Sequence, residues 1–243
     1  MNRISSYPER IVPHQTTGGP LASHLKRYDF ASHFTKDRIV LDVACGMGYG
    51  TFFLSDFART VDGVDISSES IAYAKSHYKK SNIEFYVMDA CKLKFPDQSY
   101  DIVCSFETLE HLDYPEEFLK EVKRVIKKTG VFIVSTPHAR KTTYKPSNPF
   151  HKFELSYTDF ESFLKKYFAR VEIFGERRKQ SNFHYYLQKL DIFHFRAMLP
   201  GILRKKVCNA VGTRSWDEAD NSDIIIDKKM MPRSTELIAV CSF

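Results

Sequence analysis

The sequence predicts an α/β fold in which helices cover both faces of a mostly parallel sheet. From about residue 39 onward, short runs rich in β-branched residues alternate with stretches of helical periodicity. Strands that are separated by helices of this length are typical of βαβ units and of a parallel sheet. A chain of 243 residues with 43% hydrophobic and 14% aromatic content is also long enough to bury the core of such a fold.

The expected strands follow one another in a regular order. They are "RIVLDVA", "TVDGVDIS", "IEFYVMDA", "YDIVCSFE", "GVFIVSTP", "ARVEIFG" and, at the end of the chain, "STELIAVCSF". Helical patterns lie between them in "SIAYAKSHYKK" and in "SYTDFESFLKKYF", where Ser156 or Thr158 is expected to cap the helix.

A third helix is expected over residues 115–128. Pro115 suits its first turn, Lys127 and Lys128 suit its last turn, and Gly130 suits its end. Apolar residues recur at helical spacing and predict its buried face. They are Phe118, Leu119, Val122, Val125 and Ile126.

Composition restricts the compartment and the partners. Five scattered cysteines without a CxxC pair fit reduced thiols better than a disulfide framework or a zinc site. The N-terminal "MNRISSYPERIVP" has no apolar signal core, and no stretch approaches the length of a membrane span. We therefore expect a cytoplasmic protein. A net charge of +6 is modest for this length and predicts no DNA partner.

A glycine-rich turn follows the first expected strand, in "VLDVACGMGYG". Glycines at this point free backbone amides to face a ligand at the N-terminus of the next helix. A dinucleotide fingerprint that begins at Gly46 would need its third glycine at position 51, where Thr51 stands. The spacing Gly46-x-Gly48-x-Gly50 therefore makes NAD a weaker interpretation.

Acidic residues end the next two expected strands. Asp65 is placed to accept hydrogen bonds from two ribose hydroxyls, and Asp89 to accept one from an adenine amino group. Either aspartate alone also suits an ordinary strand end or cap. Together, beside a glycine turn, they favour a nucleoside ligand.

These motifs resemble, in order and spacing, those of class I S-adenosylmethionine (SAM)-dependent methyltransferases. The resemblance covers about residues 20–175 and the last strand, and Ala44 departs from it because many members have glycine there. It implies a Rossmann-like, doubly wound sheet of seven strands with the last one antiparallel, and SAM as the cofactor. The residues that it assigns to SAM are Asp42, Ala44, Gly46, Gly48, Asp65, Ile66, Asp89, Ala90 and Phe106.

By the same resemblance, Gly46 and Gly48 lie against the methionine part of SAM and Asp65 binds the ribose. Asp89 and the amide of Ala90 recognise the adenine. Phe106 lies beside the sulfonium.

The stretch "SFETLEHL" follows the fourth expected strand, at the edge where an open α/β sheet binds its ligand. In a helix, Glu107, Glu110 and His111 would share one face and could hold a cation. The same three residues also suit a plain helix start on the surface.

The stretch resembles the ExxEH element of ubiquinone-biosynthesis methyltransferases and of enzymes that methylate the terminal ribose of small RNAs. "NPFHKFELSYTDF" resembles their later His-x-Phe-Glu segment. This implies a divalent metal site of Glu107, Glu110, His111 and His151. His111 or His151 is the candidate base with or without a metal, and Glu107 is a third catalytic candidate.

The two ends of the chain differ from the central core. The opening "YPERIVPHQTTGGPLASHLKRYDFA" resembles the N-terminal arm of methyltransferases for bacterial cell-surface and metabolite sugars, which implies that Arg27 reaches the SAM carboxylate. A helix packed on the sheet edge is the alternative. The predicted division is an arm and helix at 1–36, a core at 37–175, an insertion at 176–233 and a final core strand at 234–243.

The insertion carries the basic excess of the chain. Residues 177–206 contain eight lysines and arginines and a single acidic residue, Asp191, along an apolar stripe of helical spacing. The stripe contains Phe183, Tyr186, Leu187, Leu190, Phe193, Ala197 and Met198. A lid over the acceptor, a homodimer face and a helix on an anionic membrane are the three interpretations.

The sequence as a whole predicts a SAM-dependent O-methyltransferase for a sugar hydroxyl, in a polysaccharide or a glycosylated metabolite. Its expected partner is a small-molecule or glycan acceptor. An RNA ribose 2′-O-methyltransferase is the alternative, but no aromatic stacking platform or RNA-binding module is identifiable. A non-catalytic scaffold with the same fold is the alternative from another class.

Overall fold

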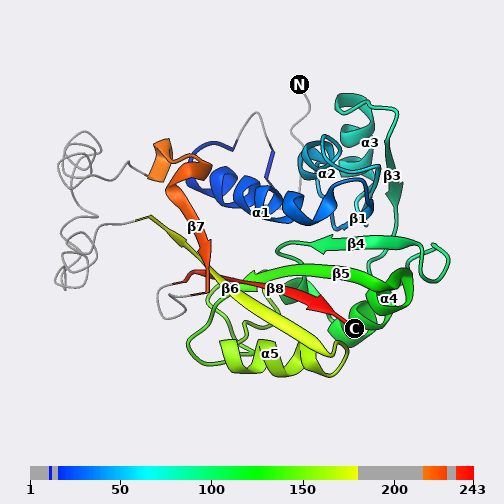
Figure 1. The fold of residues 1–243 in the computed structure, drawn as a ribbon. Coiled ribbons are helices and arrows are strands. Elements are labelled where there is room, and N and C mark those ends of the chain that lie inside the picture. Colours follow the sequence, from blue (N-terminus) through cyan, green and yellow to red (C-terminus); the bar gives the residue numbers. More distant parts are fainter. Residues whose placement is uncertain (1–10, 13–15, 180–215, 229–233) are drawn as a thin grey trace.

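A computed structural model describes residues 11–12, 16–179, 216–228 and 234–243 (Figure 1). These residues form one twisted sheet with helices on both faces. The helical stripe predicted between residues 183 and 198 lies outside the described residues. Among the described helices, none combines the length and the apolar character needed to cross a membrane.

The described sheet has eight strands in the order β3-β2-β1-β4-β5-β8-β6-β7. The first five in this order run parallel to one another, and β8 runs antiparallel to both β5 and β6. The strands are β1 (Ile39–Val43), β2 (Thr60–Asp65), β3 (Ile83–Val87), β4 (Tyr100–Ser105), β5 (Ile126–Pro137), β6 (Arg170–Arg178), β7 (Ile224–Asp227) and β8 (Glu236–Ser242). The predicted fold class and the antiparallel last strand are confirmed.

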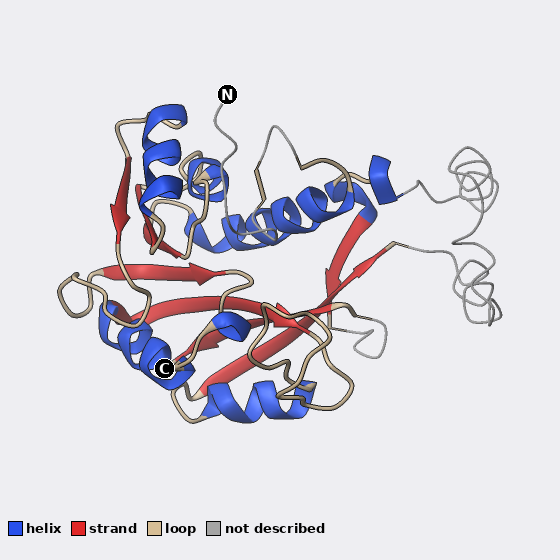
Figure 2. Ribbon diagram, turned by 180° about the vertical axis from the view of Figure 1, so that it is seen from behind, coloured by secondary structure: helices blue, strands red, loops and turns tan. Residues whose placement is uncertain are grey.

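The helices form two layers. Figures 1 and 2 show α1, α2 and α3 on one face of the sheet and α4 and α5 on the other. The bounds are α1 (Gly19–Thr35), α2 (Tyr49–Leu54), α3 (Ser68–His77), α4 (Pro115–Val125) and α5 (Tyr157–Lys165), with short 3-10 helices η1 (Leu109–His111), η2 (Trp216–Glu218) and η3 (Asn221–Asp223). Ser156 caps α5, because its side chain accepts a hydrogen bond from the Asp159 amide.

Alternation along the central strands builds a core on each face. Leu41 and Val103 point toward α4 and α5, whereas Val40, Ile102 and Cys104 point toward α1 and α2. Successive strand side chains face opposite sides of a sheet, so one strand supplies both cores. The parallel strands are therefore buried on both faces, as their continuous apolar runs predict.

Helix α4 ends earlier than the sequence predicts. Its apolar face is fully buried as expected, but the helix stops at Val125 and Ile126 already takes an extended conformation. Ile126 pairs with Tyr100 of β4, and Lys127 donates to Asp101 at 2.9 Å. These contacts with β4 draw residues 126–130 into the sheet, so the prediction that Lys127 and Lys128 close the helix was wrong.

The sheet has one strand more than the seven expected. Strand β7 lies inside the segment assigned to the insertion and pairs antiparallel with the last residues of β6, from Gly175 to Arg178. Its three consecutive isoleucines, Ile224 to Ile226, are a β-branched run of the kind that forms an edge strand. The run is too short to predict a strand by itself.

Candidate active site

The loop after β1 is shaped by residues with left-handed backbone. The φ angles are 61° at Ala44, 55° at Gly46 and 82° at Gly48. A Cβ at Gly48 would come within 2.6 Å of the Ala74 Cβ, but a Cβ at Gly46 would meet nothing within 4 Å. Close packing of α2 on α3 therefore requires Gly48, whereas Gly46 faces open space where a ligand can approach the backbone.

Asp65 ties this loop to the end of β2. Its Oδ2 accepts a hydrogen bond from the Gly46 amide at 2.9 Å, and its Oδ1 accepts one from the Ser67 amide at 2.8 Å. The carboxylate therefore holds the glycine turn against the start of α3. The contact of Asp65 with ribose hydroxyls stays a prediction. The two amides hold its carboxylate at the end of β2, where that prediction places it.

Apolar side chains are exposed at the ends of β2 and β3. Ile66 is 73% exposed and Val87 is 51% exposed, and Asp65 and Val87 are partners in the sheet. Asp89 lies two residues beyond β3, is exposed, and accepts a hydrogen bond from the Cys91 amide. Ile66 and Val87 thus expose apolar side chains at neighbouring strand ends, where they could pack on a planar base. The adenine contacts of Asp89 and Ala90 stay predictions. Val87 was missed because strand alternation alone does not mark an exposed end.

Two predicted cofactor residues, Asp42 and Phe106, are packed against α1, and their contacts with SAM stay predictions. Asp42 is fully buried and accepts hydrogen bonds from Thr51 Oγ1 at 2.7 Å and from the Tyr28 hydroxyl at 3.3 Å. Burial raises the pKa of the Asp42 carboxyl to about 7. The Phe106 ring lies edge to face on the Tyr28 ring, with 5.0 Å between centroids. Asp42 and Phe106 therefore position α1 above the strand ends.

Arg27 of α1 is engaged in a buried ion-pair network. Its Nε and Nη2 donate to the two carboxylate oxygens of Glu176 at 2.7 and 3.2 Å, and its Nη1 lies 3.3 Å from Glu107 Oε1. Burial lowers the pKa of Arg27, but the carboxylates of Glu107 and Glu176 outweigh that effect and raise it. To reach the SAM carboxylate as predicted, the Arg27 guanidinium would have to bind it in addition to Glu107 and Glu176.

Four carboxylates gather around Arg27 at the edges of four neighbouring strands. Glu107 follows β4, and Glu110 lies in η1 and accepts a hydrogen bond from Thr136 near the end of β5. Glu176 lies in β6, and Glu236 begins β8. Glu176 and Glu236 stand directly opposite each other in the sheet, an arrangement that repels when both are charged. Burial foremost, and then the charge of Glu107, raise the pKa of both Glu110 and Glu236 well above the usual value.

Glu107 does not lie on a helix, so the condition for a common helical face with Glu110 and His111 is not met. Its φ angle is 51°, and the helix that follows is a single 3-10 turn, η1. Ser135 Oγ donates to Glu107 Oε1 at 2.7 Å, which turns this carboxylate toward Arg27. The left-handed backbone at Glu107 breaks the helical register, so the expected common face of residues 107, 110 and 111 does not form.

The structure nevertheless brings together Glu110, His111 and His151. One potential ligand atom from each lies within 4.8 Å of the others, and the two imidazole centroids are 5.0 Å apart. Glu110 is fully buried. Its Oε2 accepts a hydrogen bond from Thr136, but its buried Oε1 has no hydrogen-bond partner and lies 3.9 Å from His111 Nε2. Three of the four predicted metal ligands therefore meet, without Glu107.

Hydrogen bonds fix the orientation of both imidazoles. His111 Nδ1 is 3.0 Å from the Phe150 carbonyl oxygen, which can only accept, so Nδ1 carries a proton and Nε2 is turned toward Glu110. His151 Nδ1 donates to Glu154 Oε1 at 2.8 Å, and its Nε2 lies 2.9 Å from Asn148 Nδ2, a hydrogen-bond donor. A carbonyl or carboxylate behind each imidazole is the arrangement that supports a metal ligand or a base.

These three residues would fit a divalent cation once His151 Nε2 exchanges its hydrogen bond with Asn148 for the metal. A buried carboxylate oxygen without a hydrogen-bond partner is costly in a folded protein, and a cation beside it would remove that cost. Two imidazoles and one carboxylate suit several divalent ions. The same imidazoles also suit proton transfer without a metal.

Comparisons with known proteins place this geometry in context. A family described as "Methyltransferase domain" matches residues 41–134. The chain is 32% identical over 209 residues to the "Probable S-adenosylmethionine-dependent methyltransferase" of Mycolicibacterium smegmatis, a match that covers 81% of this chain and 74% of that protein. Among further relatives, some are named for O-methylation and others for N-methylation.

Two more similarities extend this comparison. A Mycobacterium tuberculosis relative with the same description, Rv3030, is 35% identical over 132 residues, which cover 52% of this chain and 47% of that protein. The crystal structure of YcgJ from Bacillus subtilis superposes with a TM-score of 0.58 at 18% identity, over 90% of this chain and 98% of that chain. The similarity to YcgJ shows a shared fold.

Proposed function

The chain belongs to the SAM-dependent methyltransferases, and from this premise we propose that it methylates a hydroxyl group of a sugar. The observation that carries the proposal is the meeting of Glu110, His111 and His151 at the end of β4. SAM, when bound, supplies an electrophilic methyl group. The residues of this chain would then position the acceptor and remove its proton.

A proton acceptor supports O-methylation in particular. A hydroxyl is a poor nucleophile while it keeps its proton, so its methylation needs a base or a cation close to the oxygen. His111 suits this role because its Nδ1 donates to the Phe150 carbonyl, so that Nε2 is the ring nitrogen that would accept the proton. His151 is the second candidate. Its Nδ1 donates to Glu154, and its Nε2 would have to exchange the hydrogen bond with the Asn148 side chain for the acceptor hydroxyl.

A divalent cation at the same residues is part of the proposal. Glu110, His111 and His151 would hold it, and it would lower the pKa of a hydroxyl bound to it. Glu107 would not bind the cation itself, because Ser135 and Arg27 hold its carboxylate. Its role is then to position Arg27 and the loop that begins η1.

The sugar acceptor rests on a separate observation. The N-terminal arm resembles that of sugar methyltransferases, and its described helix α1 packs over the strand ends through Tyr28 and Arg27. Helix α1 therefore covers the region in which an acceptor would meet the methyl group. Aromatic packing of Phe106 on Tyr28 fixes this cover in place.

Calorimetric titration with SAM and with its demethylated product tests the donor site, before and after chelator treatment and metal addition. Transfer of tritium from methyl-labelled SAM to a library of saccharides tests the acceptor. His111→Ala should bind SAM almost normally and lose about 10²- to 10⁴-fold in turnover. His77→Ala, an exposed histidine of α3, is the matched control.

Three outcomes would contradict the proposal. Full activity of His111→Ala would remove this residue from the mechanism. Transfer to short RNA but not to saccharides would favour the ribose 2′-O-methyltransferase, and SAM binding without transfer to any acceptor would favour the scaffold.

A further inference from the structure

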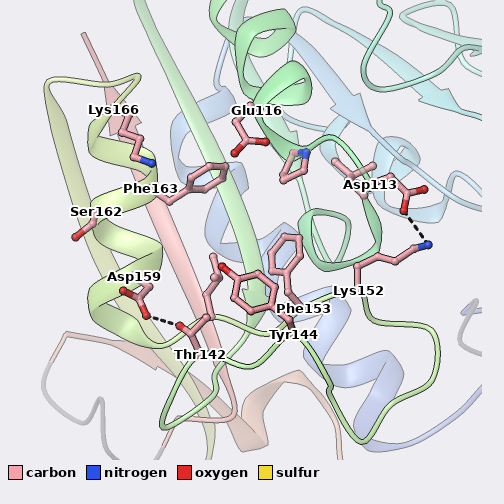
Figure 3. A pocket seen from close by; sticks show the side chains of 13 residues that line it. Asp113, Glu116, Thr142, Tyr144, Lys152, Phe153, Asp159, Ser162, Phe163 and Lys166 are labelled. Carbon is pink, nitrogen blue, oxygen red and sulfur yellow. Dashed lines mark hydrogen bonds and ion pairs between the residues drawn. The ribbon is translucent and has the colours of Figure 1, made fainter.

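A pocket of about 800 Å³ opens beside the candidate active site, between α4, α5 and the loop that follows β5. Figure 3 shows its side chains converging from these three elements. The pocket combines an aromatic wall with a polar rim, which is typical of small-molecule sites. None of the residues predicted to bind SAM lines it.

One ring of the aromatic wall, that of Tyr144, is largely open to solvent. Tyr144 is 76% exposed, and its ring centroid lies 6.4 Å from that of Phe153. Phe163 of α5 points toward the same space in Figure 3. An exposed aromatic ring over a concave surface offers a flat apolar face to a ligand.

The polar rim is nearly balanced in charge. Lys152 and Asp113 form an ion pair at 2.8 Å, and Thr142 donates a hydrogen bond to Asp159. With Glu116 and Lys166, the rim has three carboxylates and two ammonium groups. Such a rim offers many hydrogen-bond donors and acceptors but little net attraction for a strongly charged ligand.

The pocket is adjacent to the candidate active site along both chain segments that build it. Asp113 lies two residues after His111, and Lys152 directly follows His151. Consecutive Cα atoms are only about 3.8 Å apart. The Lys152 amide also donates to the Glu110 carbonyl at 2.7 Å, which fastens the pocket wall to η1.

We propose that this pocket is a saccharide subsite, which holds a neutral sugar unit of the acceptor next to the unit that is methylated. This inference rests on the proposed function. A pyranose has an apolar face of C–H groups and a rim of hydroxyls. The face packs on Tyr144, and the hydroxyls bond to the carboxylates and ammonium groups of the rim.

A printed array of neutral, amino and anionic glycans tests this subsite with fluorescently labelled protein. The wild-type protein should bind a set of neutral glycans. Tyr144→Ala should weaken that binding about tenfold or more, because the stacking ring is lost. Tyr144→Phe keeps the ring and should retain the binding. Phe57→Ala removes another exposed ring, at the opposite end of the strands, and is the matched control.

The outcomes separate this inference from the proposed function. Binding of no glycan, binding of anionic glycans alone, or equal binding by the wild-type protein and Tyr144→Ala would each overturn the subsite. Calorimetric SAM binding and methyl transfer are measured on the same preparations. If SAM binds and a sugar is methylated equally well by Tyr144→Ala, the subsite is wrong and the proposed function stands. If SAM does not bind, the proposed function fails by itself.

Discussion

The two halves of the ligand-binding edge of the sheet are built in different ways. The cofactor half comprises the ends of β1, β2 and β3, and the acceptor half comprises the ends of β4, β5 and β6 with the start of β8. In the cofactor half, Asp65 contacts Gly46 and Ser67 through backbone amides. In the acceptor half, Arg27 and Glu176 meet as side chains across 149 positions of sequence.

The cofactor half and the acceptor half differ in how strongly their stability depends on charge. Neutral donors hold the two carboxylates of the cofactor half: backbone amides bind Asp65, and the hydroxyls of Thr51 and Tyr28 bind Asp42. A single guanidinium, Arg27, faces the four carboxylates of the acceptor half. Removal of one charge should therefore matter far more to folding in the acceptor half than in the cofactor half.

Substitution of Arg27 by methionine should have the largest effect on stability. The change leaves Glu176 buried without its partner and opposite Glu236, so we expect a loss of about 3–5 kcal/mol in the free energy of unfolding. Urea denaturation measures it. Lys26→Met removes a more exposed ion pair to Asp29 and should cost less than about 1 kcal/mol.

A second variant shows whether the loss comes from the stranded carboxylate. Arg27→Met combined with Glu176→Met should regain part of the stability, because the buried carboxylate of Glu176 is gone while Glu107 still lacks its contact with the guanidinium. Equal stability of Arg27→Met and Lys26→Met would contradict the role of the buried network.

Substitution of Asp65 by alanine should act on binding more than on folding. We expect SAM affinity to fall about 10- to 100-fold, the effect of losing hydrogen bonds to a charged group. Calorimetry measures the affinity, and thermal unfolding shows how far the loop has changed. Asp56→Ala, an exposed aspartate paired with Lys80, is the control. Unchanged affinity in Asp65→Ala would remove the predicted ribose contact.

The two loop glycines should respond differently to alanine. Gly48→Ala places a Cβ within 2.6 Å of Ala74, so steric overlap adds to a conformational cost of about 1–2 kcal/mol. Gly46→Ala meets no neighbour and bears the conformational cost alone, but its new methyl group projects into the open space. We expect Gly48→Ala to destabilise the fold more and Gly46→Ala to affect SAM binding. Denaturation and calorimetry on both variants distinguish the two effects, and equal unfolding curves would contradict the packing role of Gly48.

The same contrast explains what the sequence predicts and what it does not. The glycine turn and Asp65 are close in sequence to the strands that position them, so local pattern predicts both the fold and the cofactor half. The pair of Glu176 and Glu236 depends on the register between β6 and β8, and its partner Arg27 comes from the N-terminal helix. Local patterns of hydrophobicity carry no signal for such a pair.

The cluster of Glu110, His111 and His151 is less predictable than the glycine turn and more predictable than the pair of Glu176 and Glu236. The motif resemblance predicts its members, but the expected helix geometry was wrong, because Glu107 adopts a left-handed conformation that propensity does not predict. The loop that carries His151 brings it to His111 by docking of Lys152 on Glu110. The residues that meet in the cluster were therefore more predictable than the backbone conformation that carries them.

The smallest expected effect concerns the protonation of Glu236. Burial foremost, then the charges of neighbouring groups, raise its pKa well above the usual value of 4.5 in the folded protein. Between pH 4.5 and the raised pKa, the folded protein binds a proton that the unfolded chain has released. An increase in pH through this range therefore lowers the free energy of unfolding. The groups that act on Glu236 are Glu107, Arg27, Glu176 and Glu110.

Glu236→Gln should remove this dependence, because glutamine stays neutral at every pH. The variant should gain stability relative to the wild-type protein as the pH rises from 5 to 8, and urea denaturation at several pH values measures the difference. Glu110 and Asp42 also have raised pKa values, so the comparison between the two proteins isolates the contribution of Glu236. Glu84→Gln, an exposed glutamate of β3, should parallel the wild-type curve. If the stability of Glu236→Gln follows the wild-type pH curve as well, Glu236 is ionised in the folded protein. Arg27 would then stabilise the charge of Glu236 in addition to those of Glu176 and Glu107.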